Sequence, residues 1–115
     1  MAVSLQNFRA ISGDDIAIDV TVTDFDDAAV DITGCLIRWG ARKVGETSTA
    51  ISKSTTDGGI TITDGPAGQF RVSLDPADTA SLAGVFEHEA ELTDLTGAVS
   101  TVCTGSMRIE EDLVV

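Results

Sequence analysis

The chain of 115 residues has no tyrosine, one tryptophan and one histidine, and its 7 basic residues are outnumbered by 19 acidic ones. The resulting formal net charge of −12 excludes a protein that neutralises the phosphates of nucleic acid. Aromatic residues make up 4% of the chain, too few to line the deep aromatic cleft of a glycosidase. These absences direct attention away from nucleic-acid binding and carbohydrate cleavage.

Long hydrophobic runs are also missing from the sequence. No stretch approaches 18 consecutive apolar residues, and the first residues have neither a basic region nor an uninterrupted apolar core of the kind that signal peptides carry. We therefore expect no membrane partner, no secretory leader, and synthesis in the cytoplasm.

Cysteine is nearly absent, and its placement limits its chemistry. Cys35 and Cys103 are far apart and lack the Cys-x-x-Cys spacing of zinc ribbons and thioredoxin-like sites. Two interpretations remain open at this stage. The cysteines are either reduced, buried, small apolar side chains, which we favour, or a bridge between two strands.

What the sequence has in abundance is β-forming residues in alternating patterns. Val, Ile and Thr supply 34 of the 115 residues. Alternation of apolar and polar residues predicts strands over 16–23, 35–42, 60–62, 70–74, 86–92 and 99–109. A short, exposed edge strand is expected near Ile51. Turn signals between these runs favour an antiparallel β-sandwich of seven to eight strands, a single domain over residues 1–115.

Two local predictions accompany this architecture. Asp75 can cap a helical turn that starts at Pro76, so we expect one short helical segment near residues 76–82. In the last strand, alternate residues from Val99 to Ile109 are expected to point inward, with Gly105 marking a bulge or bend. This inward row comprises Val99, Thr101, Cys103, Gly105, Met107 and Ile109.

No set of residues in the sequence forms a recognisable catalytic site. His88 is the only side chain that ordinarily titrates near neutral pH, and the alternation places it on the inner face with Phe86 and Ala90. A hydrogen-bonded core histidine is favoured over a catalytic base. The Gly-x-Ser-x-Gly pattern of α/β-hydrolases is absent. We predict that the protein is not an enzyme, and that it has no catalytic residues and no cofactor.

The strongest metal candidate is an acidic segment between two predicted strands. Four carboxylates that a loop could converge on Ca²⁺ are Asp24, Asp26, Asp27 and Asp31. The spacing does not follow the EF-hand pattern, because the sixth position is Ala29 and the twelfth is Cys35. An ordinary acidic turn is therefore the favoured interpretation, with calcium binding as the alternative.

Candidate protein-contact residues lie on one predicted strand and at both ends of the chain. Arg38 and Arg42 either dock an acidic partner or balance neighbouring acids within the sheet, and we favour balance. The apolar end segments either pair with the sheet edge of another subunit in a homo-oligomer, or pair or fray within the monomer. Their interface candidates are Val3, Leu5, Leu113, Val114 and Val115.

The order of turn and strand residues resembles one known family over residues 8–110. The motifs are Gly13-Asp14, Asp24-x-Asp26-Asp27-x-x-Val30-Asp31-Ile32-Thr33-Gly34, Ile37-x-Trp39-x-Ala41-Arg42, Gly68-Gln-Phe70, Leu74, Asp78-Thr79-x-x-Leu82-x-Gly84-Val-Phe86, Asp94-x-x-Gly97, Thr101-Val102-x-x-Gly105 and Ile109. In this respect the chain resembles the N-terminal domain of phage and prophage baseplate upper proteins. Longer family members continue into further domains, so their bridging role to a receptor-binding protein is not carried over.

The resemblance implies an immunoglobulin-like β-sandwich and a non-enzymatic structural role in the tail or baseplate of a phage or prophage. It implies a location in the virion and other phage structural proteins as partners. The alternative function is a small calcium- or carbohydrate-binding β-sandwich module.

Overall fold

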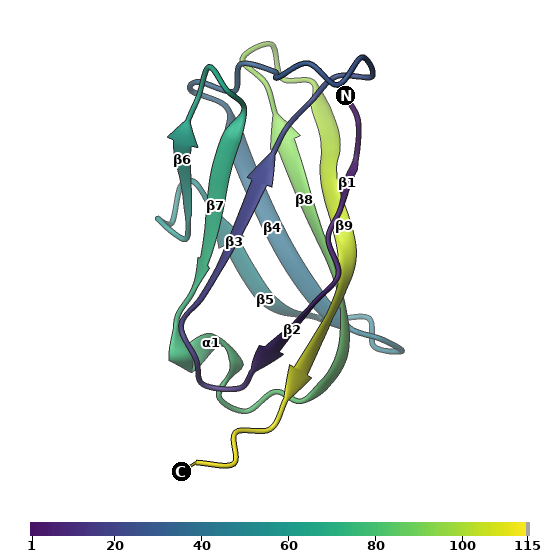
Figure 1. Cartoon of the computed structure of the whole chain (residues 1–115), viewed down its shortest axis with the longest axis vertical. Helices are drawn as coiled ribbons and strands as arrows, with labels where there is room; N and C mark the ends of the chain where they lie inside the picture. The colour runs from purple at the N-terminus through teal and green to yellow at the C-terminus, as the bar shows by residue number, and fades with distance from the viewer. Residues whose placement is uncertain (115) are drawn as a thin grey trace.

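The computed structural model describes residues 1–114, which form two β-sheets packed face to face (Figure 1). The larger sheet has the strand order β1-β9-β8-β4-β5, and β2 also pairs with β9. Its strands are β1 (Ser4–Leu5), β2 (Phe8–Ile11), β4 (Leu36–Lys43), β5 (Thr49–Ser54), β8 (Gly84–Thr93) and β9 (Val99–Glu110). The smaller sheet, β3-β7-β6, consists of β3 (Ile16–Thr21), β6 (Ile60–Asp64) and β7 (Gln69–Leu74).

This arrangement is an immunoglobulin-like β-sandwich, as predicted. The strands β9, β8, β4 and β5 correspond to G, F, C and C′ of a variable-type domain, and β3, β7 and β6 correspond to B, E and D. Trp39 on β4 is buried in the position of the strand-C tryptophan. The cysteines lie outside β3 and β8, so the usual disulfide between strands B and F has no counterpart.

The core lies between the sheets because the strands alternate as the sequence predicts. In β3, Ile18 and Val20 are buried while Ala17 and Asp19 face solvent. The same alternation holds in β4, β7 and β8. Burying such a row of Ile, Val, Leu and Phe side chains stabilises the fold by ~1.5–3 kcal/mol for each one. The largest fully buried side chains are Trp39, Phe70, Phe86, Ile32, Ile37, Leu74, Leu92, Met107 and Ile109.

Residues 1–114 form nine strands, one or two more than the predicted seven to eight, because the N-terminal segment forms β1 and β2. Both β1 and β2 pair with β9 in the parallel direction, so the large sheet is mixed rather than wholly antiparallel. The two strands have two and four residues, too short for alternation to mark them.

The last strand changes phase where the sequence-based prediction kept it constant. Ala90 of β8 pairs with Cys103, whereas Glu91 pairs with Thr101, so Val102 is an extra residue in β9. Val102 and Cys103 are both buried, and Val99 is exposed. The prediction that Val99 and Thr101 point inward was therefore wrong, and the bulge lies at Val102 instead of Gly105.

The predicted helical turn is present but shorter than expected. Helix α1 covers Pro76–Thr79, after Asp75 as the N-cap residue. The Asp78 carboxylate accepts a hydrogen bond from the backbone N–H of Asp75 at 2.6 Å and forms an ion pair with Lys53 of β5 at 2.8 Å. This small element ties the connection between β7 and β8 to the edge of the large sheet. Among residues 1–114, no helix is long and apolar enough to span a membrane.

Candidate functional site

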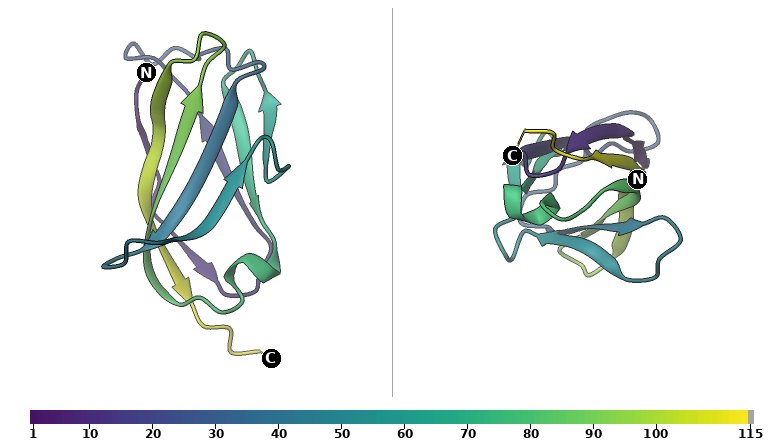
Figure 2. Two further views of the ribbon diagram at one scale, coloured as in Figure 1. Left: turned by 180° about the vertical axis from the view of Figure 1, so that it is seen from behind. Right: turned by 90° about the horizontal axis from the view of Figure 1, so that it is seen from below.

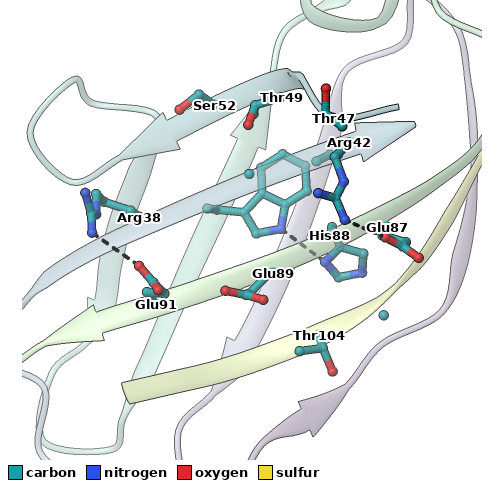
Figure 3. Close-up of a pocket in the computed structure, with 14 residues that line it drawn as sticks. Arg38, Arg42, Thr47, Thr49, Ser52, Glu87, His88, Glu89, Glu91 and Thr104 are labelled. Atoms are coloured by element: carbon teal, nitrogen blue, oxygen red, sulfur yellow. Dashed lines mark hydrogen bonds and ion pairs between the residues drawn. The ribbon is translucent and has the colours of Figure 1, made fainter. Parts of the chain in front are cut away.

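The outer face of the large sheet carries a shallow groove of about 680 Å³ (Figure 3). Strands β5, β4, β8 and β9 form its floor, and the view from behind in Figure 2 brings β4 and β5 to the front. The polar side chains labelled around it are Arg38, Arg42, Thr47, Thr49, Ser52, Glu87, Glu89, Glu91 and Thr104, and His88 is labelled behind the sheet.

Cross-strand ion pairs occupy both ends of this groove. Arg38 of β4 lies directly opposite Glu91 of β8, with an N···O distance of 3.2 Å, and Arg42 lies opposite Glu87 at the same distance. These exposed pairs contribute at most about 1 kcal/mol each. The prediction that the two arginines balance neighbouring acids within the sheet is confirmed.

Between the two ion pairs, the sheet presents one carboxylate and several small residues. Glu89 is opposite Gly40 on β4 and Thr104 on β9, and Gly40 is opposite Ser52 on β5. The small side chains leave the groove open above the sheet. The groove can offer hydrogen bonds and charge to a ligand. The hydrogen bonds between its polar side chains are the two Arg–Glu pairs, and neither joins a nucleophile to a base.

His88 lies on the other side of the sheet, where it is 3% exposed. Its Nδ1 accepts a hydrogen bond from Trp39 Nε1 at 3.1 Å, so the imidazole proton is on Nε2, which donates to the Gln6 carbonyl at 2.7 Å. Burial lowers the pKa of His88 despite the Gln6 bond, which raises it. The prediction of a hydrogen-bonded core histidine is confirmed.

Gly105 makes this hydrogen-bonded chain possible. A Cβ at this position would overlap the Gln6 carbonyl group and come within 2.9 Å of His88 Nε2. Between β1 and β2, the N-terminal segment therefore approaches β9 closely at the one β9 residue that has no side chain to obstruct it. The bulge predicted at Gly105 is not there, and the glycine instead permits the close approach of the Gln6 backbone.

Both cysteines are free and buried, as the favoured interpretation predicted. Burial raises the pKa of the Cys103 thiol to about 11. The pKa of Cys35 is raised by burial and by the negative charges of Asp94 and Asp31. The thiolate, which is the reactive form, is therefore suppressed at both positions near neutral pH.

The acidic segment uses its carboxylates to build turns. Asp24 Oδ1 accepts hydrogen bonds from the backbone N–H groups of Asp26 and Ala28, at 2.8 and 3.0 Å. Asp31 Oδ1 accepts from the N–H and hydroxyl of Thr33, which lower the pKa of Asp31. Within residues 1–114, no three His, Cys, Asp or Glu side chains are grouped so that they could hold a metal ion. The acidic-turn interpretation therefore accounts for Asp24 and Asp31.

The turn that starts at Asp24 has the same hydrogen-bond pattern as the turn between β8 and β9. Asp94 Oδ1 accepts from the N–H groups of Thr96 and Ala98, matching positions two and four after Asp24. In each turn, the aspartate N–H donates to the carbonyl four residues later, and the residue three positions on has a positive φ. Those residues are Asp27, with φ 64°, and Gly97, with φ 90°. This equivalence was not predicted from the sequence, although both segments read Asp-apolar-x-x-Ala.

Each of these turns holds one large apolar side chain in solvent, at the residue after the aspartate. Phe25 is 85% exposed and Leu95 is 79% exposed. Both turns lie at the same end of the sandwich, at the top of Figure 1. We call Phe25 and Leu95, with the surrounding aspartates, the apolar tip.

The connection that carries Phe25 is anchored on both sides. Val22 and Ile32 are fully buried, and their N–H groups donate to the carbonyls of Gly68 and Gly65 in the β6–β7 turn. A Cβ at Gly68 would come within 2.7 Å of the carbonyls of Val22 and Val30, so this turn packs directly on the connection. The Phe25 turn therefore projects from a fixed base.

The two chain ends differ in how they are arranged. Val3 and Leu5 are exposed, and β1, which contains Leu5, pairs with β9 of the same chain. Of the two alternatives left open by the sequence, the N-terminal end therefore shows pairing within the chain. Leu113, 89% exposed, and Val114 follow the end of β9, and Val115 lies outside the described residues.

Comparisons with known proteins add a similarity to solved structures. No family model matches the chain, and no curated protein matches it. A solved structure titled "Tim-1" is similar to this chain, with a TM-score of 0.44 and 12% identity over 99% of each chain.

Proposed function

We propose that this chain is a non-enzymatic structural component of a phage or prophage tail or baseplate, which acts through contacts with other virion proteins. The phage assignment rests on the sequence resemblance described above. The observation that carries the contact role is the apolar tip, where Phe25 and Leu95 are held in solvent on two equivalent turns.

The construction of the tip supports a role in binding another protein. An aromatic and a leucine side chain that are held in solvent on neighbouring turns would each gain ~1.5–3 kcal/mol when a contact with another protein buries them. The aspartate hydrogen bonds fix both turns before a partner arrives. Preorganisation of this kind reduces the ordering entropy lost on binding, so contact residues on such turns add more to affinity.

The proposal is tested in particles produced by a bacterium that carries the gene. We expect the protein to co-purify with density-gradient-purified particles at a fixed ratio to the major tail proteins, as measured by quantitative mass spectrometry. Finding it only in the particle-free fraction would contradict the proposed function.

A matched pair of variants links the result to the tip. A strain that lacks the gene is complemented with either the Phe25→Ser, Leu95→Ser variant or the Val114→Ser variant. Both sets of changes replace exposed apolar side chains. Only the tip variant is expected to be missing from particles, and equal incorporation of the two would contradict a contact role for the tip.

A further inference from the structure

We infer that the partner of the apolar tip is a second copy of this chain, which receives the tip on the opposite end of its large sheet. This inference rests on the proposed function and deepens it by naming the partner and the receiving surface. The acidic side chains of the tip are Asp24, Asp26, Asp27, Asp31 and Asp94. Neither residues 22–35 nor residues 94–98 include a lysine or an arginine.

The receiving surface is an apolar pair beside three arginines, which we call the arginine-flanked patch. The Val44 N–H donates to the Val85 carbonyl, and Val85 is the register partner of Arg108 on β9. Arg108 is in turn the partner of Arg9 on β2. Val44 is 52% exposed and Val85 42% exposed. The patch is therefore a row across four strands, completed by Arg42 on β4.

Arginines outnumber the acidic side chains on this patch by one, whereas the charged side chains of the tip are all acidic. Arg9 and Arg108 share the Glu110 carboxylate, at 3.0 and 3.9 Å, and Arg42 pairs with Glu87. Three guanidinium groups thus face two carboxylates, in a chain whose net charge is −12. The neighbouring turn adds one charge of each sign, at Lys43 and Glu46, and Glu111 and Asp112 follow the end of β9. An acidic tip with two apolar side chains is complementary in both charge and polarity to this patch.

The positions of the two surfaces determine the geometry of the contact. The tip lies at one end of the long axis, and the ends of β4 and β9, with the patch, lie toward the other (Figures 1 and 2). A contact between two different surfaces is heterologous, so it joins copies head to tail into rings or filaments. The molecule measures 25 × 23 Å across its long axis. A contact at one end therefore buries at most roughly 500 Å² of surface per partner, which is less than a stable interface needs, so a single contact is weak.

The first experiment measures self-association by sedimentation velocity at protein concentrations from about 10 µM to about 1 mM, the range suited to a small interface. We expect association that rises with concentration and weakens at high salt. The Phe25→Ser, Leu95→Ser variant and the Val85→Ser, Arg108→Glu variant are each expected to associate at least ~10-fold more weakly. Wild-type protein that stays monomeric throughout would overturn the inference.

Mixing the two variants provides the decisive measurement. Each variant keeps one intact surface, so a head-to-tail contact predicts that the mixture forms a 1:1 dimer while each variant alone remains monomeric. A variant that carries all four substitutions is the control, and it should associate with neither. Failure of the mixture to form dimers, or association unaffected by the substitutions, would also overturn the inference. Circular dichroism of each variant establishes that it is folded.

The outcomes separate this inference from the proposed function. A protein that is monomeric at every concentration but present in particles keeps its structural role, and its tip must then bind a different virion protein. A protein that self-associates through the tip and patch but is absent from particles supports the contact described here and contradicts the phage role.

Discussion

Gly105 lies where the N-terminal segment approaches β9 most closely. We predict that Gly105→Ala lowers the free energy of unfolding by more than ~2 kcal/mol, because its Cβ would overlap the Gln6 carbonyl and separate it from His88. Urea denaturation measures the change. Gly40→Ala is the matched control, since a Cβ there meets its nearest atom at 3.5 Å and should change stability by less than ~0.5 kcal/mol. Similar losses in both variants would contradict this explanation.

His88 gives the protein a pH dependence that can be assigned to one residue. The unfolded chain takes up a proton at the ordinary pKa of 6.5, whereas the folded pKa is lower because of burial. The unfolded state therefore binds more protons than the folded state below about pH 6.5. The free energy of unfolding falls as the pH drops from about 6.5 toward the lower pKa of the folded state, by up to ~1.4 kcal/mol per pH unit.

The measurement compares urea unfolding at about pH 7.5 and about pH 5.5, above the range in which most carboxylates titrate. His88→Gln is the control, because an amide can accept from Trp39 and donate to Gln6 but does not titrate. We expect the variant to lose less stability on acidification than the wild type. Equal losses would show that another group is responsible.

At the scale of single elements, α1 depends on a carboxylate that has two partners. Asp78 accepts from the Asp75 N–H and pairs with Lys53, and these two interactions lower its pKa although burial alone would raise it. We predict that Asp78→Ala destabilises the protein by about 1–2 kcal/mol. Glu89→Ala removes the same charge from an exposed position on β8 and should have a much smaller effect on the urea midpoint. A loss of equal size would mean that only net charge matters.

The strands also show how much of the fold can be predicted from sequence. Alternation identifies β3, β4, β7 and β8, because each of these strands has one face in the core and one in solvent. It fails in β9, where the extra residue Val102 shifts the phase. The adjacent apolar residues Val102 and Cys103 were the available signal, because a bulge lets two consecutive residues of a strand face the same core.

The N-terminal strands and the candidate site were less predictable for a different reason. The strand β2 is defined by its pairing with β9, which is about a hundred residues away in sequence, so no local pattern marks it. The prediction for Arg38 and Arg42 succeeded because residues on one face of neighbouring strands meet directly. The apolar tip was not predicted, since exposure of Phe25 and Leu95 depends on how the turns are anchored rather than on their composition.

For the molecule as a whole, the net charge of −12 opposes compaction. Raising the NaCl concentration from about 0.01 M to about 0.15 M shortens the Debye length from ~30 to ~8 Å, so we predict a higher melting temperature at the higher salt concentration.

CaCl₂ at equal ionic strength should raise the melting temperature no further than NaCl does, because Asp24 and Asp31 already bind backbone N–H groups. A ligand present at 100 times its Kd would add ~2.7 kcal/mol, so a markedly larger rise with calcium would indicate a bound ion at the acidic segment. That result would favour the calcium-binding module over a protein that works through contacts alone.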